Sequence, residues 1–188
     1  IKILIARSLI MEDTLPLIYV SGLLIFVIGL GIFVIVQIFK TRRVEGTFNK
    51  LQKKLQKEKG TAKEYYELGS LYLDKKLYVQ ALSLLQKALK ISGEESIEPE
   101  NQALIYNALG FSYFAQEQLE LAIRNYKEAI KLYPQYSIAL NNLGNVYEKK
   151  QMAKKALETY EETLKFDPNN TVAKKRAESL RKRFAESK

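Results

Sequence analysis

The chain has 188 residues and contains neither cysteine nor histidine, which removes thiolate and imidazole nucleophiles, disulfides and almost all zinc, haem and iron–sulfur ligation. Its formal net charge of +9 is concentrated at residues 40–60, with eight Lys or Arg against two Glu, and at residues 171–188, with seven against two. The segment between them is nearly neutral, so no basic stripe crosses the fold and we predict no nucleic-acid partner. Because Cys and His are missing, the sequence shows no catalytic constellation, and we also predict no enzymatic activity, no cofactor and no metal.

Residues 1–16 precede a long apolar stretch and form a separate N-terminal segment. The first residue is Ile, and Met11 would make a natural start. Residues 1–10 are therefore interpreted either as an upstream extension of the reading frame or as a genuine short apolar segment.

Residues 17–39 contain no charge, and as a helix they span roughly 34 Å, which is enough to cross a bilayer. A cleaved signal peptide would have a shorter apolar region followed by small residues, whereas Lys40, Arg42 and Arg43 follow here. We therefore predict one uncleaved, single-pass transmembrane helix. The cations after it and the acids before it place the following residues on the cytoplasmic side, or the stromal side of a plastid.

Two glycines of this span, Gly22 and Gly29, lie seven residues apart and so share one helix face. They are a candidate packing surface for a membrane helix of a partner. Alternatively, they reflect the general frequency of glycine in membrane helices.

Residues 40–60 form a basic juxtamembrane helix with an apolar stripe at Val44, Phe48, Leu51 and Leu55. This helix could lie on anionic headgroups or could cap the folded residues that follow. Gly60 stops it, and Thr61 with Glu64 has the spacing of a capping box that opens the next helix.

Residues 61–170 repeat one pattern three times, at about 62–95, 103–136 and 137–170. The clearest copy places Leu109 and Gly110 on one helix face, followed by Ala122 and Tyr126 on a second helix. The same pattern returns 34 residues later at Gly144 and occurs 41 residues earlier at Gly69. The seven extra residues are expected in the loop around residues 93–100.

Residues 171–188 are expected to form a basic capping helix and tail. The apolar positions of this helix are Ala173, Ala177, Leu180 and Phe184, and Glu178 stands where the repeat has glycine. A polar outer face is what the terminal element of a repeat array needs for solubility.

The repeated pattern, aromatic-x2-L-G-x2-Y followed by A-x3-Y, A and P, resembles the tetratricopeptide repeat (TPR), with Tyr106 where that family usually has Trp. The resemblance implies an all-α fold: an N-terminal transmembrane helix followed by a three-repeat TPR solenoid and a C-terminal capping helix.

The same resemblance implies a concave protein-binding groove on the first helix of each repeat. The groove positions are Tyr66, Ser70, Leu73, Asn107, Phe111, Phe114, Asn141, Asn142 and Asn145. The Asn amides could bind the backbone of an extended peptide and the two Phe could receive an apolar side chain. Alternatively, the Asn are ordinary exposed residues and the Phe pack against the insertion or the cap.

Some TPR proteins hold the C-terminal carboxylates of heat-shock chaperones with Lys, Asn and Arg. The matching positions here are Tyr66, Ser70, Ala108, Ile138 and Asn142, and only Asn142 is polar in the required way. We therefore predict no carboxylate clamp for heat-shock chaperones.

The order of span, basic helix, insertion-bearing repeats and basic last helix resembles the membrane-anchored TPR proteins of cyanobacteria and plastids that assist photosystem I assembly. The resemblance covers roughly residues 11–184 and implies a thylakoid membrane location with stromal repeats. It implies transient binding of photosystem I core subunits or assembly intermediates. Two alternatives stay open. One is a membrane-anchored TPR receptor for protein import or export, and the other is a structural subunit that only stabilises the complex to which it belongs.

Overall fold

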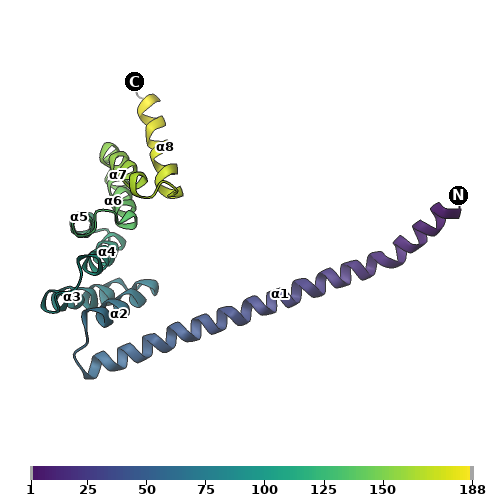
Figure 1. Ribbon diagram of the computed structural model, residues 1–188, viewed down its shortest axis with the longest axis horizontal. Coiled ribbons are helices and arrows are strands. Elements are labelled where there is room, and N and C mark those ends of the chain that lie inside the picture. Colours follow the sequence, from purple (N-terminus) through teal and green to yellow (C-terminus); the bar gives the residue numbers. More distant parts are fainter. Residues whose placement is uncertain (1, 187–188) are drawn as a thin grey trace. The chain divides into compact units, whose positions relative to one another are not determined.

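The computed structural model describes the backbone of residues 2–186 and the side chains of residues 19–186. Within these residues the fold is all-α, as predicted, and contains no strand. Eight helices follow in chain order (Figure 1): α1 (Lys2–Lys57), α2 (Ala62–Asp74), α3 (Tyr78–Glu94), α4 (Pro99–Ala115), α5 (Leu119–Leu132), α6 (Ser137–Lys149), α7 (Ala153–Phe166) and α8 (Thr171–Glu186). The described residues divide into two compact units between Lys50 and Leu51.

The first unit is the long part of α1. From Tyr19 onward it includes a window of mean hydropathy 2.8 with none of its side chains buried, so by length and composition this helix can cross a membrane. Large apolar side chains are exposed along it as far as Phe39. Residue 1 and the side chains of residues 1–18 lie outside the described part, so of the predicted segment 1–16 only the backbone of residues 2–16 is described, as the start of α1.

Gly22 and Gly29 lie on this exposed part of α1. Among the described residues, a methyl group added at either glycine would meet nothing within 4 Å. The role of this small-residue surface in packing a partner's helix stays a prediction.

The last two turns of α1 belong to the second unit and pack onto the first repeat. Leu51 is only 8% exposed, and Leu55 joins the core cluster that contains Leu85. Gln52 Nε2 donates a hydrogen bond of 3.0 Å to the hydroxyl of Tyr72. These are the contacts of an N-terminal cap, the second of the two roles considered for the basic helix.

The predicted capping box at the start of α2 is confirmed. The side chain of Thr61 accepts the Glu64 N–H at 3.2 Å, and the Glu64 carboxylate accepts the Thr61 N–H at 3.1 Å. The first repeat therefore begins at Ala62 with two of its free N–H groups satisfied.

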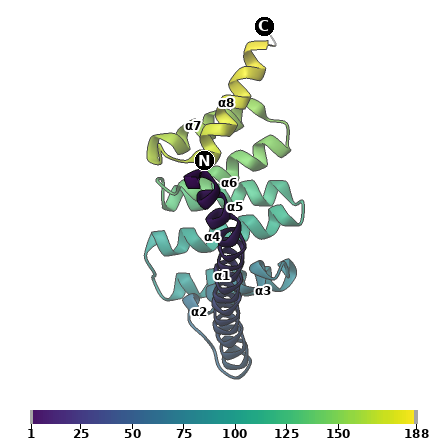
Figure 2. The same ribbon diagram turned by 90° about the vertical axis from the view of Figure 1, so that its right-hand side faces the viewer.

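Three helix pairs make up the repeats: α2 with α3, α4 with α5, and α6 with α7. The pairs stack in chain order, and α8 packs on α7 (Figure 2). A close crossing of the two helices in each pair is possible because a glycine faces a large buried side chain. Those glycines are Gly69 against Leu85, Gly110 against Tyr126, and Gly144 against Tyr160.

The seven extra residues do not lengthen a loop, contrary to the prediction. The connection between α3 and α4 has the same length as the connection between α5 and α6, whereas α3 has 17 residues against 14 in α5 and α7. Likewise, α4 has 17 residues against 13 in α2 and α6. Pro99 is at the first position of α4 and Glu100 is in its first turn, both favourable there, so the insertion is absorbed as added helix.

Candidate functional site

The predicted groove residues lie on α2, α4 and α6, the first helices of the three pairs. None of the nine is fully buried, and Phe111 and Asn145 are the exposed ones. The other seven are half-buried, so their contacts decide which of them remain available to a partner.

Two of the predicted asparagines are bonded to each other rather than free. Asn142 Nδ2 donates to Asn107 Oδ1 at 3.0 Å, and Asn107 Nδ2 donates to the hydroxyl of Tyr136 at 3.3 Å. This polar ladder joins the second and third repeats across their interface. The amides of Asn107 and Asn142 are therefore engaged in holding the two repeats together.

Tyr136, the third member of the ladder, was not foreseen. Its ring stacks on Tyr133 with 5.6 Å between centroids. Burial, with a smaller contribution from Tyr66, raises the pKa of Tyr136 to about 12, although the hydrogen bond from Asn107 acts in the opposite direction. The residue lies directly before α6, two positions after Pro134, and the sequence gives no sign of a bond to a residue 29 positions earlier.

Asn141 is held at the junction of α6 with α8. Its Nδ2 donates to Asn170 Oδ1 at 2.9 Å, and the same oxygen accepts the Ala173 N–H at 3.0 Å in the first turn of α8. Asn141 Oδ1 is buried and has no hydrogen-bond partner among the residues whose side chains are described. A buried acceptor without a donor is unfavourable by about 1–3 kcal/mol.

Asn145 is the one predicted asparagine whose exposed amide makes no hydrogen bond within residues 19–186. It lines a cavity of ≈ 280 Å³ between α6, α7 and α8, called the C-terminal cavity here. Its lining residues are Ile138, Asn141, Asn142, Asn145, Tyr160, Val172 and Arg176. The structure thus brings three predicted residues together with four that the groove prediction did not include.

Arg176 is the charged member of the C-terminal cavity. Its Nε lies 3.7 Å from Glu148 Oε2, and the same carboxylate oxygen accepts the Tyr160 hydroxyl at 2.8 Å. Burial and the hydrogen bond to Glu148 raise the pKa of Tyr160, so this phenol stays protonated at physiological pH. The side chain of Arg176 remains 54% exposed.

The two predicted phenylalanines differ in how far their rings remain available to a partner. Phe111 meets the edge of Tyr78, the first residue of α3, with 6.5 Å between ring centroids. Phe114 packs against the core cluster around Tyr126, and the Lys149 ammonium lies 5.3 Å from its ring centroid. Phe114 thus shares a core cluster with Ala173, Ala177 and Leu180 of the capping helix α8, whereas Phe111, 40% exposed, remains accessible.

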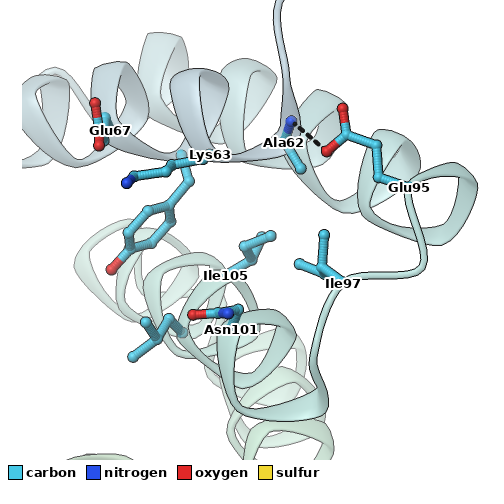
Figure 3. Close-up of a pocket in the computed structure, with 9 residues that line it drawn as sticks. Ala62, Lys63, Glu67, Glu95, Ile97, Asn101 and Ile105 are labelled. Carbon is cyan, nitrogen blue, oxygen red and sulfur yellow. Dashed lines mark hydrogen bonds between the residues drawn. The ribbon is translucent and has the colours of Figure 1, made fainter.

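A second cavity, of ≈ 370 Å³, lies beside the lengthened start of α4 and is called the N-terminal cavity here. Its walls are Ala62, Lys63, Tyr66, Glu67, Glu95, Ile97, Asn101, Leu104 and Ile105. Figure 3 shows Ile97 and Ile105 pointing toward one another, with the Ala62 N–H donating to Glu95 at 3.2 Å beside them. Tyr66 is the only predicted groove residue there.

The positions of a heat-shock carboxylate clamp carry no cation. Ala108 is buried, Ile138 is 56% exposed, and Asn142 is engaged with Asn107. The absence of a clamp remains a prediction about partners, supported by the chemistry of these side chains.

The tetratricopeptide repeat models match residues 61–135 and 107–171. The chain is 39% identical over 132 residues to the ycf37 protein of Cyanophora paradoxa, covering 70% of this chain and 75% of that protein. It is 37% identical over 122 residues to PYG7, a chloroplastic tetratricopeptide repeat domain-containing protein of Arabidopsis thaliana, covering 64% of this chain and 39% of PYG7. The crystal structure of MamA superposes with a TM-score of 0.67 at 24% identity, covering 78% of this chain and 81% of MamA, a likeness of fold.

Proposed function

The chain belongs to the family of plastid tetratricopeptide repeat proteins that includes ycf37, and from this premise we propose that it is a membrane-tethered scaffold. In this proposal it binds photosystem I core subunits or subcomplexes transiently during their assembly. It performs no catalysis, in keeping with the general use of TPR arrays as protein-interaction surfaces.

The observation that carries the proposal is the combination, in one chain, of two features. One is a helix of membrane-spanning length whose most apolar window buries none of its side chains in the described structure. The other is a repeat array with a groove that keeps exposed apolar and amide groups, such as Phe111 and Asn145. Tethering at a membrane raises the effective concentration of the array toward partners assembling in the same membrane.

The charge next to the apolar segment supports an orientation. Lys40, Arg42 and Arg43 follow it directly, and the positive-inside rule assigns such a flank to the cytoplasmic or stromal side. The proposed location is therefore the thylakoid membrane, with the repeats in the stroma. The plastid origin of the relatives supports the compartment.

Affinity purification of the tagged full-length protein from membranes solubilised in mild detergent tests this function. We expect photosystem I core subunits in incomplete, subunit-poor particles, and no protein of this chain in the finished complex. Alkaline carbonate should leave the protein in the membrane, and added protease should remove the repeats from the stromal side. Precursor proteins or translocon components as the principal bound proteins would contradict the proposal and favour an import or export receptor.

A further inference from the structure

The C-terminal cavity presents a cation that is only partly neutralised. Arg176 carries five N–H donors, and its one acidic neighbour within residues 19–186 is Glu148, 3.7 Å from Nε. That distance is an ion pair rather than a hydrogen bond. The two terminal nitrogens of this half-exposed side chain are therefore available for a bidentate contact, the geometry in which arginine binds carboxylates.

The same cavity offers groups that suit an extended polypeptide. Asn145 supplies an exposed amide donor and acceptor. Ile138 and Val172, each 56% exposed, provide an apolar contact for one aliphatic side chain. The backbone N–H and C=O groups of a bound segment can form hydrogen bonds with the Asn145 amide. The side chains of that segment can contact Ile138, Val172 and Arg176.

The surface continues into a neighbouring cavity of ≈ 430 Å³ that shares Val172 and Arg176 and adds Lys175. Helix α8 as a whole carries six Lys or Arg against two Glu. This neighbouring charge favours a negatively charged occupant with more than one carboxylate. Single-stranded nucleic-acid sites usually combine such charge with exposed aromatic rings that stack on the bases, and the one aromatic residue of the C-terminal cavity, Tyr160, is 1% exposed.

We infer that this end of the groove binds an acidic, extended segment of a partner protein, with a carboxylate of that segment on Arg176. A second carboxylate faces Lys175, and an aliphatic side chain between the two lies against Ile138 and Val172. The inference rests on the proposed scaffold function and specifies the kind of segment that the scaffold recognises. Arg176 would thereby determine specificity, although it belongs to the capping helix rather than to a repeat.

The test is fluorescence anisotropy with the full-length protein in detergent and two labelled peptides, GESLSEG and GQSLSQG. In an extended chain, alternate residues face the same side, so both Glu and the Leu of the first peptide meet one surface. We expect the acidic peptide to bind about tenfold more tightly than the neutral one. R176Q should reduce this ratio to below about threefold, while K182Q, which removes the same charge from α8 outside both cavities, should leave it near tenfold.

N145D provides a second variant, because a carboxylate added at this exposed position repels the acidic peptide more than the neutral one, so the ratio of their affinities should fall. Far-UV circular dichroism confirms that each variant is folded. A ratio near one for the unaltered protein would overturn the inference. Equal losses in R176Q and K182Q would also overturn it, as would tighter Arg176-dependent binding of labelled oligouridylate or anionic lipid vesicles.

This assay contains no photosystem component, so its result is independent of the purification from membranes. Photosystem I subunits recovered without peptide discrimination would leave the scaffold function standing and remove this inference. Discrimination by Arg176 without those subunits would keep the inference and assign the groove to another acidic partner.

Discussion

Gly110 lies directly against the ring of Tyr126. A Cβ added to Gly110 would lie 2.7 Å from Cδ1 and Cε1 of that ring, closer than a methyl group and an aromatic carbon can approach. Tyr126 is 1% exposed, so its ring has no free space into which it can move. The close approach of α4 and α5 therefore depends on the missing side chain.

We predict that Gly110→Ala destabilises the array. Overpacking of a core contact is unfavourable by typically 1–3 kcal/mol, and the better helix propensity of alanine returns at most about 1 kcal/mol. The net loss should appear as a lower midpoint in urea or thermal unfolding followed by circular dichroism.

Gly93→Ala is the matched control for this change. Gly93 is also helical, in the last turns of α3, but nothing lies within 4 Å of its added Cβ. This variant should be neutral or slightly stabilising. Equal midpoints for the two variants would show that the Gly110 contact is relaxed in solution.

Mutations in the polar ladder between the second and third repeats should distinguish groove residues that stabilise the fold from groove residues that remain free. Asn107→Ala removes the acceptor of Asn142 and the donor to Tyr136, so we expect a loss of about 1–2 kcal/mol in the free energy of unfolding. A double-mutant cycle of Asn107→Ala and Asn142→Ala should give a coupling energy of about 0.5–1.5 kcal/mol. Asn145→Ala, at an exposed residue without a hydrogen bond, should leave the unfolding midpoint unchanged.

The raised pKa of the Tyr136 phenol predicts that the folded protein loses stability at high pH. Its pKa in the folded state is raised to about 12 by burial, from an ordinary value of 10.0. Between these values the unfolded chain has lost the phenolic proton and the folded chain has kept it, so the stabilisation is present below pH 10 and falls as the pH rises toward 12. Unfolding midpoints measured across this range should decline more steeply for the unaltered protein than for Tyr136→Phe.

Parallel declines would show that Tyr136 ionises in the folded state as freely as in the unfolded one. The constant offset between the two curves would then be the cost of the lost bond to Asn107 alone. Absorbance at 295 nm gives an independent reading, because the difference between the two proteins should titrate near pH 12.

The repeat pairs were predictable because their signature depends on local spacing. Gly110 and Tyr126 are 16 positions apart, and one helical hairpin brings any such pair together, so the same pattern found three times predicts three hairpins. The insertion was misplaced because its composition suggested a loop, while Pro99 and Glu100 are also good residues for starting a helix.

The site was less predictable because it depends on contacts between repeats. The bond from Asn142 to Asn107 joins residues 35 positions apart, and the sequence alone does not distinguish this engaged asparagine from the free amide of Asn145. In the sequence, Arg176 is one of several basic residues of the predicted capping helix, and nothing distinguishes it from the others. Its place beside Asn145 depends on how α8 packs on α7, which no repeat period encodes.

Phe111 tests whether the groove captures partners through apolar contact. Its ring is 40% exposed and touches Tyr78 only by an edge, so Phe111→Ala should change the free energy of unfolding by less than about 1 kcal/mol. The amount of photosystem I subunits recovered with the tagged protein should nevertheless fall several-fold, because a large aromatic contact is lost from the groove. Leu121→Ala is the control, since Leu121 is 39% exposed on the second helix of its pair and outside the predicted groove. Equal recovery with both variants would remove Phe111 from the binding surface, and a loss of helicity in Phe111→Ala would show that the residue belongs to the core.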